Sequence, residues 1–352
     1  MNERDNTIDL MRASALVLII LAHTISKETL LFQLRNFDVP MMAVVSGMAF
    51  AMSAPAELKL GAYYIRRFLR LLLPCWVFLT LLFCIAPLFV AGDPFSWGQI
   101  TQSFLLSNKG SIGYVWIIRV FLLVALTAPL LHALQKRVGN TAFVSILLNI
   151  YIGYELMLNY MPLPVTTWVR TLVSDYIFFG LGYSVLFGAG MLLNCLQWRG
   201  RVVFLLASAA ALILCILFKH GFNPGEMGSW FKPQNSKYPP GIYYVQWGLT
   251  MSVFTSLVCM KVPLTGRFKT GIAFLGSASL WIYFWHIVVL YVVQWNPGAF
   301  SLVRQPGALL FLFVLTASVL LTAGHRFVFG FVATRTQRFP VMNQFLTNAF
   351  LK

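Results

Sequence analysis

Long apolar stretches, separated by short polar segments, follow one another along the whole chain. A helix that crosses a bilayer needs about 17–25 mostly apolar residues, and ten stretches approach or exceed that length. This pattern predicts an all-α integral membrane protein with about ten transmembrane helices. The predicted spans are approximately residues 8–26, 39–54, 71–91, 112–131, 141–160, 171–193, 202–218, 242–260, 272–295 and 308–333.

Composition supports the same class of protein. Of the 352 residues, 59% are hydrophobic and 10% are charged, and the mean hydropathy is +0.77, whereas a soluble domain carries about 25% charged residues. No polar segment is long enough to bury a core of its own, so we predict one transmembrane domain over residues 1–340 and a short cytoplasmic tail over residues 341–352. The five cysteines lack metal-ligand or disulfide spacing, and we expect no metal site.

The basic side chains indicate how the chain is oriented in the membrane. The net charge is +16, but Lys and Arg cluster in short segments between apolar stretches, as membrane topology requires, and we expect no nucleic-acid partner. The terminal segments and the even-numbered loops carry about twice as many Lys and Arg residues as the odd-numbered loops. Because cytoplasmic loops are enriched in these residues, both termini are predicted to be cytoplasmic.

The first apolar stretch contains ionisable residues that cost free energy inside a bilayer. Arg12 and His23 are eleven residues apart, which places them on one helix face about 16 Å apart along the axis. Asp9 precedes Arg12 by one turn and can orient it. An arginine near the cytoplasmic end suits a phosphate-bearing ligand, and a histidine suits proton transfer near neutral pH. Snorkelling of Arg12 and a structural hydrogen bond of His23 are equally good readings of this helix alone.

Other predicted spans also carry ionisable side chains, and some of these share the predicted depth of His23. Such groups are functional candidates, because burying them unpaired costs a few kcal/mol or more. For Glu155 and Asp175, each taken singly, a structural hydrogen bond is the favoured interpretation. The candidates are His286 in the ninth span, Glu155 in the fifth, Asp38 and Asp175 at the outer ends of the second and sixth, and Arg119 in the fourth.

Two further features lie at the ends of the spans. The sequence RFLR at 67–70 puts Arg67 and Arg70 one helical turn apart on the same face. They can clamp a phosphate at the cytoplasmic entrance or anchor the helix to anionic lipid. The longest outward loop, about residues 219–241, is rich in aromatic residues, which suit stacking on a sugar and equally suit a membrane-interface belt.

Together, these motifs resemble those of the acyltransferase-3 family, integral membrane acyltransferases that modify bacterial surface glycans. The resemblance extends over nearly the whole chain. Its most specific part is the spacing of Arg and His in the first span, together with the FDVP and SG sequences of the second. The motifs that carry it are IDLMRASALVLIILAH, FDVPMMAVVSGMAF, RFLR, WIIRVFLLVALTAPLL, KYPPGIYY and SLWIYFWHIVVL.

The resemblance implies a ten-helix core that takes an acyl group from acyl-CoA, in the simplest case acetyl-CoA, at the cytoplasmic side. The acceptor it implies is a hydroxyl of a lipid-linked or surface saccharide, and the location is the bacterial cytoplasmic (inner) membrane, among membrane lipids. By the same analogy, His23 lies at the reaction centre. His286 or Asp38 would orient its imidazole, and the phosphates of CoA would be held by Arg12, Arg67 and Arg70.

Two mechanisms and other classes of function stay open at this point. His23 would act as a general base on the sugar hydroxyl, or as a nucleophile that forms an acyl-imidazole. A proton-coupled secondary transporter or a lipid-linked sugar flippase also fits ten spans with buried ionisable residues, although the sequence shows neither an internal repeat nor a matching pair of broken helices. A catalytically silent scaffold fits poorly with so many costly charges.

Overall fold

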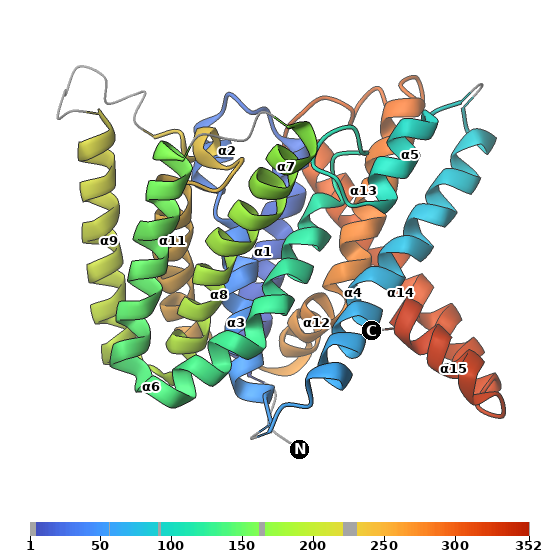
Figure 1. The fold of residues 1–352 in the computed structure, drawn as a ribbon. Helices are drawn as coiled ribbons and strands as arrows, with labels where there is room; N and C mark the ends of the chain where they lie inside the picture. The colour runs from blue at the N-terminus through green and yellow to red at the C-terminus, as the bar shows by residue number, and fades with distance from the viewer. Residues whose placement is uncertain (1–4, 56, 91–92, 162–165, 221–230, 352) are drawn as a thin grey trace. The chain divides into compact units, whose positions relative to one another are not determined.

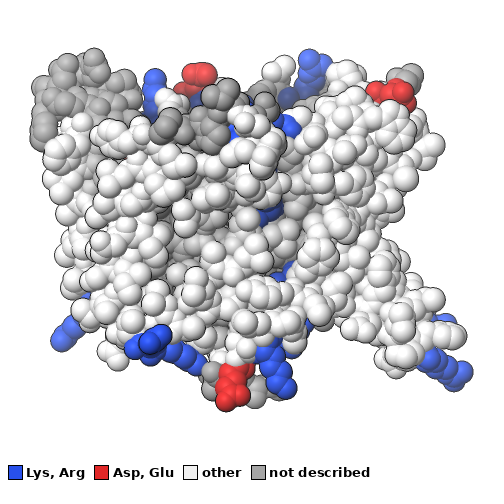
Figure 2. Space-filling view, in the orientation of Figure 1, with Lys and Arg blue, Asp and Glu red and all other residues white. Residues whose placement is uncertain are grey.

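The computed structural model describes residues 5–55, 57–90, 93–161, 166–220 and 231–351. Within these ranges the chain forms helices and no β-strand, which confirms the all-α class. In the same ranges six helices are long and apolar enough to cross a bilayer, and a bent pair makes a seventh if it counts as one span. On the face shown in Figure 2, most charged side chains lie near the helix ends, as expected of membrane spans.

Each of the ten predicted stretches overlaps a helix or a run of consecutive helical elements. The main helices are α1 (Asn6–Thr24), α3 (Asp38–Ser53), α4 (Leu60–Ile85), α6 (Trp116–Tyr160), α8 (Phe179–Cys195), α9 (Trp198–His220), α11 (Ile242–Lys261), α13 (Ser279–Trp295) and α14 (Ala308–Arg335). Shorter elements connect or follow them: α2 (Leu30–Leu34), η1 (Ala86–Leu88), α5 (Trp97–Phe104), α7 (Thr167–Thr171), η2 (Leu172–Phe178), η4 (Pro233–Ser236), α12 (Gly266–Ser277), α15 (Pro340–Leu346) and η5 (Thr347–Leu351). Ten crossings and cytoplasmic termini stay predictions.

The helical stretches contain two sharp breaks. Gly139 has a φ of 77°, so α6 is two helices that meet at this residue, and Figure 1 shows it folding back at one end. This agrees with the separate fourth and fifth stretches. The ninth stretch, predicted as one helix over 272–295, is wrong at its beginning, because α12 and α13 are bent by 75°. Gly276, Ser277 and Ser279 surround the bend, and glycine and serine are weaker helix formers than alanine or leucine.

The chain divides into two compact units. Unit 1 comprises Met1–Leu18, Glu28–Leu58 and Leu123–Gly266. Unit 2 comprises Ile19–Lys27, Lys59–Leu122 and Arg267–Lys352. The helices α1 and α6 each run through a boundary between the units, whereas the other main helices belong to one unit.

In unit 1, helix α3 packs so closely on its neighbours that glycine is needed at the contacts. A Cβ atom on Gly47 would overlap the carbonyl of Phe187 in α8, and one on Gly190 in α8 would overlap the carbonyl of Val44. On another side, Gly248 of α11 leaves room for the ring of Pro40. Small residues that let backbones approach are typical of helix contacts in membranes. The DVP and SG sequences of this helix therefore have a structural role.

In unit 2, aromatic side chains join the helices. The rings of Phe78 in α4 and Phe284 in α13 stack with their centroids 4.6 Å apart. Pro340 and residues 341–351 of the predicted tail form α15 and η5, which pack on the other helices of this unit. The indole N–H of Trp281 donates to the carbonyl of Ala349 at 3.1 Å, and the ring of Phe350 stacks on Phe329 with a centroid distance of 3.9 Å.

Candidate active site

Helix α1 carries the two residues that the sequence singled out first. It is continuous from Asn6 to Thr24, so Arg12 and His23 do lie on one helix, with His23 in its last turn. Asp9 forms an ion pair with Arg12, with Oδ1 and Nη1 4.0 Å apart, as expected for residues one turn apart. The His23 side chain is among the exposed ones, which leaves its imidazole accessible to a ligand.

The His23 ring lies in a group of aromatic rings in unit 2. Its centroid is 5.4 Å from that of His286, with the ring planes tilted by 30°. Tyr114 lies 4.9 Å from His23 and 6.0 Å from His286, edge-on to both. The structure thus brings together the two histidines that were predicted to lie at one depth, and it adds a tyrosine that sequence reasoning missed.

Tyr114 lies near the beginning of the predicted span 112–131, but the structure places it in the segment between α5 and α6, before the first residue of α6. The hydroxyl of Tyr283, in α13, donates to the backbone carbonyl of Tyr114 at 2.6 Å and holds this segment in place. Neither the position of the Tyr114 ring beside the histidines nor its backbone hydrogen bond with Tyr283 follows from hydropathy. Tyr114 precedes the helix, so it has no helical periodicity that points to its partners. No other signal in the sequence distinguishes Tyr114 from the remaining tyrosines.

His286 has a defined tautomer. Its Nδ1 atom is hydrogen-bonded to the carbonyl oxygen of Tyr283, and a carbonyl can only accept, so Nδ1 carries the proton. In the neutral ring, Nε2 then bears a lone pair. This atom is buried and has no hydrogen-bond partner among the residues that the structure describes. A buried acceptor without a partner costs about 1–3 kcal/mol, so Nε2 is suited to receive a hydrogen bond from a neighbouring donor or from a ligand.

The predicted carboxylates lie in unit 1 and have structural partners there. Asp38 accepts a hydrogen bond from Arg35 at 2.6 Å and another from the backbone N–H of Val39 at 2.8 Å. Glu155 accepts from the backbone N–H of Ile242 at 2.9 Å, which caps the beginning of α11. Asp175, in the π-helical segment η2, accepts from the hydroxyl of Ser174 at 3.0 Å. That Asp38 orients His23 stays a prediction.

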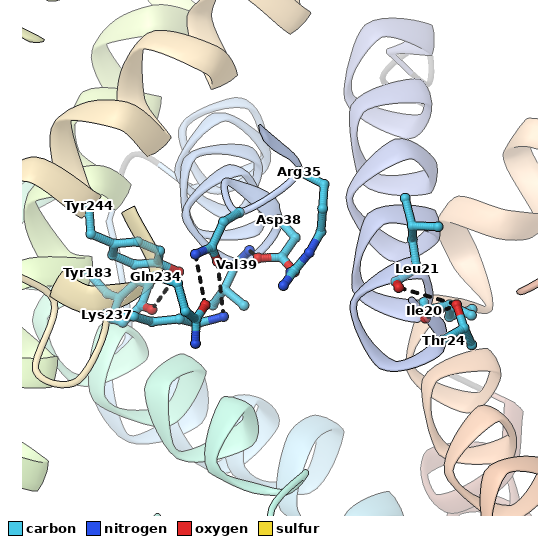
Figure 3. A network of polar contacts seen from close by, with 11 residues as sticks. Ile20, Leu21, Thr24, Arg35, Asp38, Val39, Tyr183, Gln234, Lys237 and Tyr244 are labelled. Atoms are coloured by element: carbon cyan, nitrogen blue, oxygen red, sulfur yellow. Dashed lines mark hydrogen bonds and ion pairs between the residues drawn. The ribbon is translucent and has the colours of Figure 1, made fainter. Parts of the chain in front are cut away.

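Asp38 belongs to a buried charge cluster, part of which is drawn in Figure 3. Lys237 of the KYPP sequence lies 3.4 Å from Oδ1 of Asn36, whose amide nitrogen donates to Gln234 at 2.8 Å. Burial lowers the pKa of Lys237 to about 8, while Asp38 raises it and Arg35 lowers it further. The cluster ties the segment around η4 to the corner between α2 and α3.

Aromatic residues of the loop that was predicted to face outward pack within unit 1. Phe231 packs edge-on to Trp247 at 4.7 Å, and Tyr238 stacks on Phe179 at 6.2 Å. The rest of this predicted sugar-stacking surface, including Trp230, lies outside the described residues.

The predicted phosphate-binding arginines belong to different units. Arg67 and Arg70 lie in the first half of α4, in unit 2, and the guanidinium of Arg67 lies 5.5 Å from the ring centre of Tyr63. Arg70 is exposed, whereas Arg119 in α6 is buried. Arg12 belongs to unit 1.

In the part of the chain that is described, no three His, Cys, Asp or Glu side chains gather into a group that could hold a metal ion.

The fold and the site define a multi-pass helical membrane protein with two histidines and a tyrosine clustered in one unit. A family model described as an acyltransferase domain matches residues 5–325. Since this match covers most of the chain, the protein belongs to the acyltransferase-3 family and is a membrane acyltransferase. Searches of curated proteins and of solved structures found no match.

Proposed function

We propose that the protein is an O-acyltransferase, in the simplest case an O-acetyltransferase, of the bacterial cytoplasmic membrane. It takes the acyl group from acyl-CoA at the cytoplasmic side and transfers it to a hydroxyl of a lipid-linked or surface saccharide. The observation that carries this proposal is the accessible imidazole of His23 beside His286, whose proton is held on Nδ1. Family membership supports acyl transfer over the carrier function that the sequence left open.

Two routes place His23 at the reacting atoms. As a general base, it removes this proton while the sugar oxygen attacks the thioester carbonyl. The carbon–sulfur bond then breaks, and the leaving CoA thiolate takes the proton from the imidazolium. As a nucleophile, His23 itself displaces the CoA thiolate and forms an acyl-imidazole. The sugar oxygen then attacks the acyl carbon, the carbon–nitrogen bond to His23 breaks, and the hydroxyl proton passes to the released thiolate. In both routes, Nε2 of His286 accepts a hydrogen bond from the N–H of His23 and orients the ring.

The donor is held by arginines in this proposal. Arg67 and Arg70 lie three residues apart on α4, so both can face one phosphate group. Arg12, which forms an ion pair with Asp9, is also proposed to bind phosphate, because arginine binds phosphate with two parallel hydrogen bonds. The pantetheine arm then carries the thioester toward His23.

Substitution of His23 tests the function directly. We expect His23→Ala to abolish acyl transfer to surface glycans at a normal level of protein, because both routes need the imidazole. Mass spectrometry of surface polysaccharide detects the loss as a missing acyl mass increment. His132→Ala is the matched control, since His132 packs edge-on to Phe50 in unit 1 and is expected to keep the increment. Unchanged acylation in the His23 variant would refute the proposal.

A further inference from the structure

A row of aromatic rings continues from the histidine pair within unit 2. The centroid of Tyr114 lies 6.2 Å from that of Tyr291. Tyr291 in turn stacks on Trp295, one helical turn further along α13, with centroids 5.0 Å apart and planes inclined by 24°. From His286 to Trp295 the helix rises about 14 Å, so the row runs from the reaction centre to the end of α13.

We infer that Tyr114, Tyr291 and Trp295 form a stacking platform for the sugar rings of the acceptor saccharide. This inference rests on the proposed function and assigns its acceptor-binding residues. A pyranose ring has an apolar C–H face that packs on aromatic rings, and hydroxyl groups at its edge that need hydrogen-bonding partners. The platform provides both kinds of contact.

The exposure of the three rings fits a binding surface. Each is neither buried nor fully exposed, unlike core rings such as Phe284, which is fully buried. Phe95 supports two of them from within the unit, edge-on to Tyr291 at 5.3 Å and to Trp295 at 5.9 Å. The rings are therefore fixed in position, and part of their surface stays open to a ligand.

The polar atoms of the platform are available for a ligand. Within the described residues, the hydroxyl groups of Tyr114 and Tyr291 and the indole N–H of Trp295 have no hydrogen-bond partner. The residues next to Trp295 in the sequence, Gln294 and Asn296, carry amides. Aromatic rings with a polar edge are suited to surfaces that are partly apolar and partly wet, which describes one face of a sugar.

A membrane-interface belt is the other use of such rings, and exposure argues against it. Trp97 and Trp168 are 84% and 70% exposed, as expected of tryptophans that reach into the headgroup region. Trp295 instead packs against Tyr291 and Phe95 within the unit. We therefore assign the platform to the saccharide and leave the belt as an outcome of the test.

Binding to an array of defined bacterial surface oligosaccharides tests this assignment without requiring turnover. The fluorescently labelled full-length protein in detergent should bind at least one saccharide. We expect Trp295→Ala and Tyr291→Ala to weaken that binding about tenfold, Trp295→Phe to keep most of it, and Trp168→Ala to keep all of it. If the wild type binds no saccharide, or the two alanine variants bind as well as the wild type, the platform is refuted.

The same array separates this inference from the proposed function. His23→Ala should lose acyl transfer but still bind the saccharide through the platform. If His23→Ala transfers acyl groups normally while Trp295→Ala loses binding, the catalytic proposal fails and the platform stands. If alanine variants of the platform insert poorly into membranes yet bind the array normally when purified, the rings are a membrane-interface belt and the platform fails.

Discussion

His286 shows how one backbone contact can prepare a side chain for chemistry. Because the carbonyl of Tyr283 accepts from Nδ1, the ring cannot turn without breaking this bond, and Nε2 keeps its lone pair. A histidine that orients another histidine needs a fixed tautomer more than it needs a charge. We therefore treat His286 as a positioning residue that acts through His23.

Two amide substitutions of His286 separate this role from a structural one. The amide of His286→Asn can still donate to Tyr283 but leaves nothing at the position of Nε2. We expect acyl transfer to fall about 100-fold and its pH profile to shift, with little change in thermal stability. His286→Gln places an amide nearer to that position and should keep more activity. Full activity with an unchanged pH profile in the asparagine variant would contradict the role.

At the scale of elements, close backbone contacts decide how the second span packs. The sequence predicted that span from its length, and α3 (Asp38–Ser53) agrees with the predicted 39–54 to within one residue. It did not predict which face meets α8, because lipid and helix surfaces are equally apolar and hydropathy cannot distinguish them. Glycine at positions 47 and 190 marks the contact only once the structure is known.

Gly47→Ala tests this packing. Its new Cβ would overlap the backbone carbonyl of Phe187, which cannot move without shifting α8, so we expect a loss of about 1–3 kcal/mol. Gly153→Ala is the control, because nothing lies within 4 Å of a Cβ at that position and alanine favours a helix by up to about 1 kcal/mol. Thermal unfolding in detergent measures both. Equal melting temperatures for the two variants would show that α3 and α8 are not in backbone contact.

For the whole molecule, the distribution of charge predicts an orientation that the donor also requires. CoA is cytoplasmic, and Arg67 and Arg70 lie near the beginning of α4, next to a segment predicted to be inside. In the opposite orientation the arginines would face outward, and the proposed donor path would have no access to CoA. Orientation is therefore a prediction on which the proposed function depends.

Reporter fusions measure this orientation. Alkaline phosphatase, which is active only outside the cytoplasm, should be active when fused after residue 232 and inactive when fused after residue 264. A fluorescent protein that folds only in the cytoplasm should show the reverse pattern at the same two sites. The opposite result for both reporters would invert the topology and exclude a cytoplasmic donor site built on Arg67 and Arg70.

The sequence by itself determined the class of protein, the position of nearly every long helix and the spacing of Arg12 and His23 on one of them. These features are local, because the bilayer imposes the length of an apolar stretch and the helix imposes the angle between residues. Only the tertiary structure decided that α13 begins at Ser279, that Asp38 pairs with Arg35, and that Tyr114 lies beside the two histidines. Each depends on contacts between segments far apart in the chain, and an apolar surface does not specify its neighbour.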